Sequence, residues 1–140
     1  MSRLDSFIRR LEAQRACLDR AAELIAGLPG PVLELGLGNG RTYDHLRSRL
    51  PDREIFVFDR QIAAHPDCVP PERFQVIGDF RDTLPAALAR IGRPAALIHA
   101  DLGTGDEAAS AALARQIASL LVAVLAPGGV LVGDQSMSHR

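Results

Sequence analysis

Short apolar runs alternate along this chain with longer stretches in which apolar residues recur every three or four positions. Glycine, proline or charged residues flank the runs, which predicts buried strands of a parallel sheet rather than helices. The predicted strands cover residues 32–35, 54–58, 74–77, 95–100 and 130–132. Since helices or crossovers separate them, we expect an α/β fold with a doubly wound parallel sheet of about five strands and right-handed connections.

The first 28 residues predict one long amphipathic helix. Ser2 with Asp5 can cap its N-terminus, and the glycines and prolines of residues 27–31 end it. Its apolar residues at intervals of seven are Leu4, Leu11, Leu18 and Ile25. This spacing indicates a helix that lies on the domain or on a second subunit, with a coiled coil as the alternative. A core of residues 31–134 follows it in a single domain of residues 1–140.

Three further helices are predicted between the strands. Thr104 and Glu107 have capping-box spacing, so the last helix is expected to begin there. The middle helix precedes Gly92, and Asp82 or Thr83 is better placed than Asp79 to cap it. The apolar stripes of the three helices are Tyr43, Leu46 and Leu50; Leu84, Leu88 and Ile91; and Ala109, Leu113, Ile117, Leu120 and Val124.

Three alternate glycines follow the first strand in the motif Glu34-x-Gly36-x-Gly38-x-Gly40. Glycine costs stability in regular structure, so this spacing indicates positive φ angles or a ligand close to the backbone. A dinucleotide loop has its third glycine one position later, where this chain has Arg41. No Gly-Lys-Ser/Thr follows, which excludes a nucleotide triphosphate loop.

Acidic residues stand at or near the end of every predicted strand: Glu34, Asp59, Asp79, Asp101 and Asp134. The carboxyl ends of parallel strands meet at one edge of the sheet, where ligands bind. Like charges brought together destabilise a fold unless ligands or donors satisfy them, so this edge is the predicted site. Asp59 has the position at which Rossmann-like folds place an acid that accepts hydrogen bonds from ribose hydroxyls.

The composition of the chain argues against several classes of protein. The chain has 140 residues, 47% of them hydrophobic, and a net charge of −1, so a disordered chain and a nucleic-acid partner are not expected. Cys17 and Cys68 are expected to be reduced thiols. The charged N-terminus predicts no signal peptide, and no apolar run reaches the ~20 residues of a membrane span. A cytoplasmic protein without a membrane partner is expected.

The glycine motif resembles that of class I S-adenosylmethionine-dependent methyltransferases, in particular small bacterial members of unassigned substrate. Asp59, the Asp79-Phe80 pair and the turn at residues 127–129 extend the resemblance over residues 31–134. It implies strand order 3-2-1-4-5, S-adenosyl-L-methionine as cofactor and methyl transfer to a small-molecule acceptor. The cofactor-binding residues that it implies are Glu34, Gly36, Leu37, Gly38, Asn39, Gly40, Asp59, Arg60, Gly78, Asp79, Phe80 and Asp101.

Asp101 is the candidate catalytic residue, as a general base or as a group that orients the substrate or the cofactor. His99 is the chemical alternative, although a hydrogen-bonded structural histidine is the favoured interpretation there. Asp101 with Asp134 and Gln135 is also similar to the metal site of catechol-type O-methyltransferases and would suit Mg²⁺. The prediction of no metal is preferred, because Gln replaces the usual Asn and the glycine motif differs.

Only residues 135–140 follow the fifth strand, where the family usually adds a helix and an antiparallel strand pair. We therefore expect a shortened chain or a partner that covers an apolar sheet edge, as in a homo-oligomer formed through the N-terminal helix or this edge. Two alternatives to a methyltransferase stay open. One is an NAD(P)-binding oxidoreductase in which Arg60 meets a 2′-phosphate, and the other is a non-catalytic cofactor-binding or assembly module.

Overall fold

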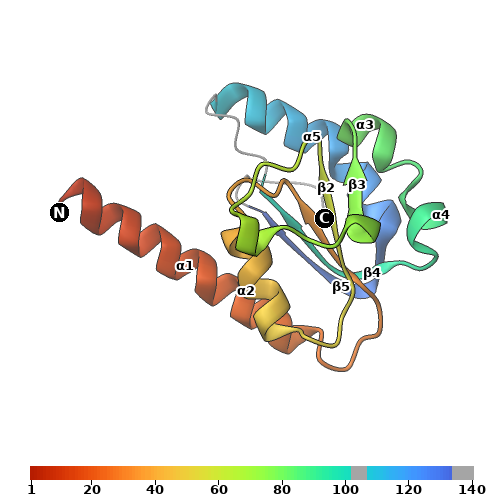
Figure 1. Cartoon of the computed structure of the whole chain (residues 1–140), viewed down its shortest axis with the longest axis horizontal. Coiled ribbons are helices and arrows are strands. Elements are labelled where there is room, and N and C mark those ends of the chain that lie inside the picture. The colour runs from red at the N-terminus through yellow and green to blue at the C-terminus, as the bar shows by residue number, and fades with distance from the viewer. Residues whose placement is uncertain (102–106, 134–140) are drawn as a thin grey trace.

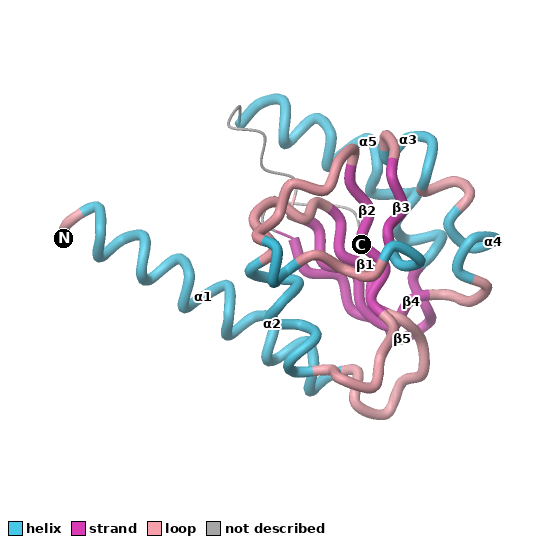
Figure 2. Tube along the Cα trace, viewed as in Figure 1, coloured by secondary structure: helices cyan, strands magenta, loops and turns pink. Residues whose placement is uncertain are grey.

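The central element is a five-stranded parallel sheet with strand order β3-β2-β1-β4-β5, as predicted (Figures 1 and 2). The computed structural model describes residues 1–101 and 107–133. The strands are β1 (Val32–Leu35), β2 (Ile55–Asp59), β3 (Gln75–Ile77), β4 (Ala95–Ala100) and β5 (Leu125–Gly133). Residues 134–140, on which the expected lack of a further strand pair depends, lie outside the described residues.

Helices cover both faces of the sheet, so the fold has three layers (Figure 1). Helices α3, α4 and α5 lie over one face, and α1 and α2 over the other. The α-helices are α1 (Arg3–Leu24), α2 (Arg41–Arg49), α3 (Phe80–Thr83), α4 (Ala87–Ile91) and α5 (Glu107–Val124). Two short 3-10 helices, Pro66–Cys68 and Glu72–Phe74, lie between β2 and β3.

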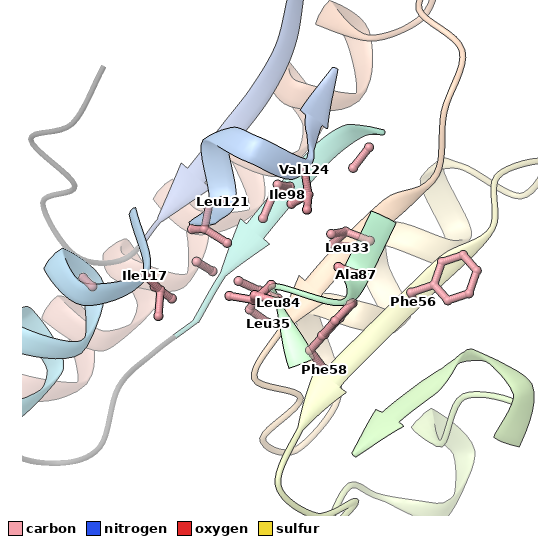
Figure 3. Packing of buried hydrophobic residues seen from close by; sticks show 13 residues of the cluster. Leu33, Leu35, Phe56, Phe58, Leu84, Ala87, Ile98, Ile117, Leu121 and Val124 are labelled. Carbon is pink, nitrogen blue, oxygen red and sulfur yellow. The ribbon is translucent and has the colours of Figure 1, made fainter. Parts of the chain in front are cut away.

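The larger core lies between the sheet and α5 (Figure 3). Leu35 and Phe58 of neighbouring strands pack with Leu84, while Ile117 and Leu121 come from α5. The predicted apolar stripe of α5 was partly wrong. Its buried residues are Ala114, Ile117, Ala118, Leu121 and Val124, whereas Ala109 is exposed and Leu113 and Leu120 are only partly buried. The helix is rotated because tertiary packing, not spacing alone, selects the buried face.

Helix α1 is anchored only by its C-terminal half. The predicted capping box is confirmed, since Ser2 Oγ accepts from the backbone N–H of Asp5 and the Asp5 carboxylate accepts from that of Ser2. Leu18 and Ile25 are buried against the sheet. Leu4, however, is 67% exposed, and the N-terminal half of the helix extends away from the domain (Figure 1).

Local boundaries differ from the prediction at two places. The helix expected around residues 84–91 is shortened to α4, and the separate helix α3 precedes it. Pro85 lies between the two and lacks the N–H that a continuous helix requires. Asp79, not Asp82 or Thr83, caps α3. Strand β5 begins earlier than predicted, at Leu125, because Leu125 already pairs with Ala95 of β4. An irregular segment follows, and regular pairing resumes where Val130 pairs with Leu97.

No helix among residues 1–101 and 107–133 combines the length and the apolar character needed to cross a membrane.

We expect Leu18→Ala to lower the free energy of unfolding by about 2–5 kcal/mol, because it leaves a cavity in a well-packed core. Leu4→Ala is the matched control on the same helix, and its exposed side chain predicts a change within about 0.5 kcal/mol. Urea unfolding followed by circular dichroism measures both. Equal effects of the two substitutions would contradict the anchoring of α1 by its C-terminal half alone.

Candidate active site

The glycine loop joins β1 to α2, and its three glycines have different roles. Gly36 has φ +86°, and a Cβ there would lie 2.1 Å from the carbonyl oxygen of Asp101. Gly40 has φ +89°, and a Cβ there would lie 2.5 Å from Cβ of Cys68. Gly38 has φ +55° but nothing within 4 Å of such a Cβ. The outer glycines therefore permit close packing, while the middle one leaves open space beside the backbone.

Glu34 lies beneath this loop and is fully buried. Its Oε2 accepts a hydrogen bond of 2.7 Å from the Thr42 hydroxyl, and its Oε1 is hydrogen-bonded to Nδ1 of His99. Glu34 and His99 are register neighbours on β1 and β4. The carboxyl group therefore binds three elements of the protein together, and it does not line a cleft at the sheet edge.

At the end of β2, both carboxylate oxygens of Asp59 accept hydrogen bonds from backbone N–H groups. Its Oδ2 accepts from the N–H of Leu37 at 2.9 Å, and its Oδ1 accepts from that of Arg60 at 2.7 Å. A carboxylate offers about four lone pairs, so each oxygen can accept a further hydrogen bond. These contacts orient the predicted ribose acceptor at the sheet edge.

Asp79 caps α3 through a 2.8 Å hydrogen bond from the backbone N–H of Arg81. Arg60 also donates to its carboxylate at 2.8 Å. The Arg81 backbone N–H above all, and then the charges of both arginines, hold the pKa of Asp79 below its ordinary value. Asp79 is therefore a carboxylate at neutral pH. The hydrogen bond to Asp79 also occupies the guanidinium group of Arg60. In the oxidoreductase alternative, this group would bind the 2′-phosphate of NADP.

A cleft of about 600 Å³, here called the strand-end cleft, brings together eight of the predicted site residues. These are Gly36, Gly38, Asp59, Arg60, Gly78, Asp79, Phe80 and Asp101. Four others do not line it: Glu34 and Leu37, whose side chains are buried, and Asn39 and Gly40. The sequence analysis missed Arg81, Ala109, Ala112, Leu113 and Gln116. The sequence predicts Ala109 and Leu113 in the core stripe of α5 and assigns Ala112 and Gln116 no role; tertiary packing places all four at the cleft.

A second cleft of about 550 Å³, here called the α1 cleft, lies between α1, the glycine loop and the ends of β4 and β5. Its lining residues are Phe7, Arg10, Leu11, Ala13, Gln14, Cys17, Gly38, Asn39, Arg41, Thr42, His99, Asp101, Val132 and Gly133. Gly38 and Asp101 line both clefts. The two clefts therefore adjoin at the end of β1 and β4.

Asp101 takes its position from the end of β4. Its backbone N–H donates to the carbonyl oxygen of Leu35 at 2.8 Å, and its side chain is partly buried. The alternative magnesium site also needs Asp134 and Gln135, which lie outside the described residues.

The strand order, the glycine loop and an acid-lined cleft at the strand ends together define a Rossmann-like cofactor-binding protein. A family model described as S-adenosyl-L-methionine methyltransferase matches residues 1–140, and the chain belongs to this family. The crystal structure of an S-adenosyl-L-methionine methyl transferase from Silicibacter pomeroyi DSS-3 is 51% identical in sequence. It superimposes with a TM-score of 0.92 over 100% of this chain and 86% of that one. No protein with a curated description matches the chain.

The family membership confirms the predicted resemblance, the cofactor S-adenosyl-L-methionine and a methyltransferase as the class of enzyme. It favours this cofactor over the dinucleotide of the oxidoreductase alternative. The position of the third glycine distinguishes the sequence from a dinucleotide-binding loop. This glycine is Gly40, which packs against Cys68.

Two glycine substitutions are expected to separate packing from ligand binding. Gly36→Ala should destabilise the fold by at least about 2 kcal/mol, because it adds both backbone strain and a clash with Asp101. Gly38→Ala should cost only about 1 kcal/mol, the usual penalty for a left-handed residue. Its methyl group enters the clefts, so we expect the affinity for S-adenosylmethionine to fall about tenfold or more.

Thermal unfolding and calorimetry measure the two effects. A Gly38→Ala protein that binds the cofactor as tightly as the native chain would contradict a ligand beside Gly38.

Proposed function

We propose that this protein transfers a methyl group from S-adenosylmethionine to a small-molecule acceptor that binds in the α1 cleft. The observation that carries the proposal is that the α1 cleft and the strand-end cleft adjoin and share Gly38 and Asp101. A methyl group transferred between two bound molecules must pass at such a junction, where donor and acceptor come within reach of one another.

The strand-end cleft fits the cofactor by its donor and acceptor groups. Asp59 offers acceptor oxygens for the two ribose hydroxyls, and Asp79 offers a carboxylate for the adenine amino group beside Phe80. Gly38 leaves open space beside the backbone for the amino acid end, and Gly36 lines the same cleft. When bound, S-adenosylmethionine supplies a methyl group on a positively charged sulfur atom.

The four predicted residues that do not line this cleft have other proposed roles. Leu37 contributes its backbone N–H to Asp59, and Gly40 lets the loop pack against Cys68. Asn39 lines the α1 cleft and its side chain accepts from the N–H of Arg41 at 3.0 Å. Glu34 acts by holding the loop rather than by contacting the cofactor.

The α1 cleft suits a small organic acceptor. Its volume lies within the ~300–1,000 Å³ of small-molecule sites. Apolar side chains such as Phe7, Leu11 and Val132 line it together with polar and charged residues of α1, the glycine loop and β4. We expect the acceptor not to be a nucleic acid, because the chain has a net charge of −1 rather than an excess of positive charge.

Alignment and exclusion of water are the main contributions that in-line methyl transfer requires from the protein. We assign Asp101 the role of the catalytic residue because it faces both clefts. In this proposal its carboxylate orients the reacting group of the acceptor toward the strand-end cleft. The proposal needs no metal ion.

Isothermal titration calorimetry tests the cofactor site. We expect saturable binding of S-adenosylmethionine and S-adenosylhomocysteine, and none of NADPH. Asp59→Ala should weaken binding about 10- to 100-fold, because hydrogen bonds to a charged group contribute about 1.5–3 kcal/mol. Asp52→Ala is the matched control, since Asp52 is an exposed acid that lines neither cleft. No binding to folded protein would contradict the proposal.

We also propose a homo-oligomer formed through α1 or the edge of β5. The N-terminal half of α1 exposes Leu4, Phe7 and Ile8, and β5 pairs only with β4 among the described strands. Both features leave apolar or hydrogen-bonding surface that a second copy can cover.

Sedimentation equilibrium tests this assembly. The double substitution Leu4→Ser/Ile8→Ser should convert dimer to monomer if α1 forms the contact. Val122→Ser, at another exposed apolar residue, is the control and should leave the dimer intact. A dimer that survives the double substitution places the contact at β5, and a monomeric native chain contradicts the proposal.

A further inference from the structure

Two arginines line the α1 cleft without a carboxylate partner. Arg10 comes from α1, and Arg41 is the first residue of α2. Over residues 1–101 and 107–133, neither guanidinium group forms an ion pair with a carboxylate. Each group therefore keeps N–H donors and a positive charge that a molecule in the cleft can use.

The arginines of the neighbouring strand-end cleft are placed differently. Arg60 and Arg81 line that cleft, and both form ion pairs with Asp79, at 2.8 and 3.4 Å. In the α1 cleft, Asp101 is the only acid among the described lining residues, and the strand-end cleft shares it. The two clefts therefore differ in charge, and the α1 cleft is the one that favours an anion.

An aromatic ring restrains Arg10 at the wall of the α1 cleft. The guanidinium carbon of Arg10 lies 5.0 Å from the centre of the Phe7 ring, which is within the range of a cation–π contact. Both residues line the cleft. The contact supplies no negative charge, and it reduces the freedom that the arginine side chain loses when a ligand binds.

The rest of the wall suits an organic anion rather than an inorganic ion. Phe7, Leu11 and Val132 give the cleft an apolar part, and its volume of about 550 Å³ is that of a small-molecule site. Guanidinium groups bind carboxylate and phosphate through pairs of parallel N–H bonds. A molecule with an oxyanion group and an apolar body therefore matches both parts of the wall.

A smaller hollow of about 270 Å³ between α1 and α2 also includes Arg41. Its lining residues include Arg15 together with the acid Glu12, and they do not include Asp101. Only the α1 cleft adjoins the strand-end cleft, where the methyl donor is proposed to bind. The acceptor must lie beside the donor, so the α1 cleft is the place for the anion.

We infer that the methyl acceptor is a small organic anion whose carboxylate or phosphate group is bound by Arg10 and Arg41. The inference rests on the proposed function, which assigns the α1 cleft to the acceptor. The two arginines are then residues that determine specificity. A neutral molecule of the same shape would cover two cations without compensating their charge, and this cost selects against it.

Benzoate and benzamide are matched probes, because they have nearly the same shape and differ in charge. Phenyl phosphate is the third probe. Each is titrated into the full-length ¹⁵N-labelled protein, with and without saturating S-adenosylhomocysteine, and amide chemical shifts give the dissociation constants. We expect benzoate or phenyl phosphate to bind at least about tenfold more tightly than benzamide.

The order of the two anions decides between carboxylate and phosphate as the preferred group. If neither anion binds more tightly than benzamide, the inference is overturned. This comparison uses only the native chain, so it does not depend on the folding of any variant.

Arg10→Gln and Arg41→Gln locate the bound anion. We expect each to weaken binding of the preferred anion about three- to tenfold and to leave benzamide binding unchanged. Arg9→Gln is the matched control, because Arg9 precedes Arg10 on α1, carries the same charge and lines neither cleft. Thermal unfolding verifies that the variants fold. Equal losses in Arg9→Gln and Arg10→Gln would indicate a general effect of charge and overturn the inference.

Arg15→Gln distinguishes the α1 cleft from the smaller hollow, since Arg15 lines only the hollow. We expect it to bind the anion as tightly as the native chain. Weaker binding in Arg15→Gln with native binding in Arg10→Gln would place the anion in the hollow and overturn the inference.

Calorimetry with S-adenosylhomocysteine separates this inference from the proposed function. Arg10→Gln and Arg41→Gln should bind it with the affinity of the native chain, because neither arginine lines the strand-end cleft. Weaker binding in both variants would assign the arginines to the carboxylate of the cofactor and overturn the inference. A native chain that does not bind S-adenosylhomocysteine contradicts the proposed function instead.

Discussion

A carboxyl group buried at the centre of a parallel sheet is the constraint on which the rest of the site depends. Glu34 needs partners because a buried acid without hydrogen bonds is strongly destabilising. Thr42 and His99 provide them from α2 and β4. These two hydrogen bonds join β1 and β4, at the centre of the sheet, to the helix that follows the glycine loop. The hydrogen bonds of Glu34 therefore fix the position of the glycine loop.

The ends of β1 and β4 approach each other closely beyond the Glu34–His99 contact, and this approach determines where the two clefts lie. Gly36 lies so near the carbonyl oxygen of Asp101 that no side chain fits between them. Strand order reverses between β1 and β4, since β2 follows β1 on one side and β4 lies on the other. Parallel sheets open a crevice at such a point. The strand-end cleft and the α1 cleft meet there, with Asp101 between them.

Helix α1 contributes to both stability and the site. Leu18 and Ile25 anchor its C-terminal half in the core beside α2. Phe7, Leu11 and Gln14, one to several turns earlier, form a wall of the α1 cleft. Leu4 and Ile8, near the start of the helix, are exposed and line neither cleft. The N-terminal half of α1 thus extends beyond the sheet and the helices that pack on it (Figure 1).

The sequence by itself determined the strands and the edge at which the site lies, and the resemblance to a known family added the order of the strands in the sheet. Runs such as residues 32–35 and 95–100 are buried on both faces, and glycines and acids at their ends mark the turns. It also identified Asp59, Asp79 and the glycines that line the strand-end cleft. The burial of a strand and the positive φ of a glycine are local features, because they follow from neighbouring residues.

Only the tertiary structure decided which side chains meet. Glu34 and His99 are 65 residues apart in sequence, and nothing local indicates that register would pair them. The same holds for the α5 residues that line the strand-end cleft, since a helix with apolar residues on much of its surface has several faces that can be buried. Packing against β1 and β4 selected the face of α5. It also turned an acid expected to touch the cofactor into the buried partner of a histidine.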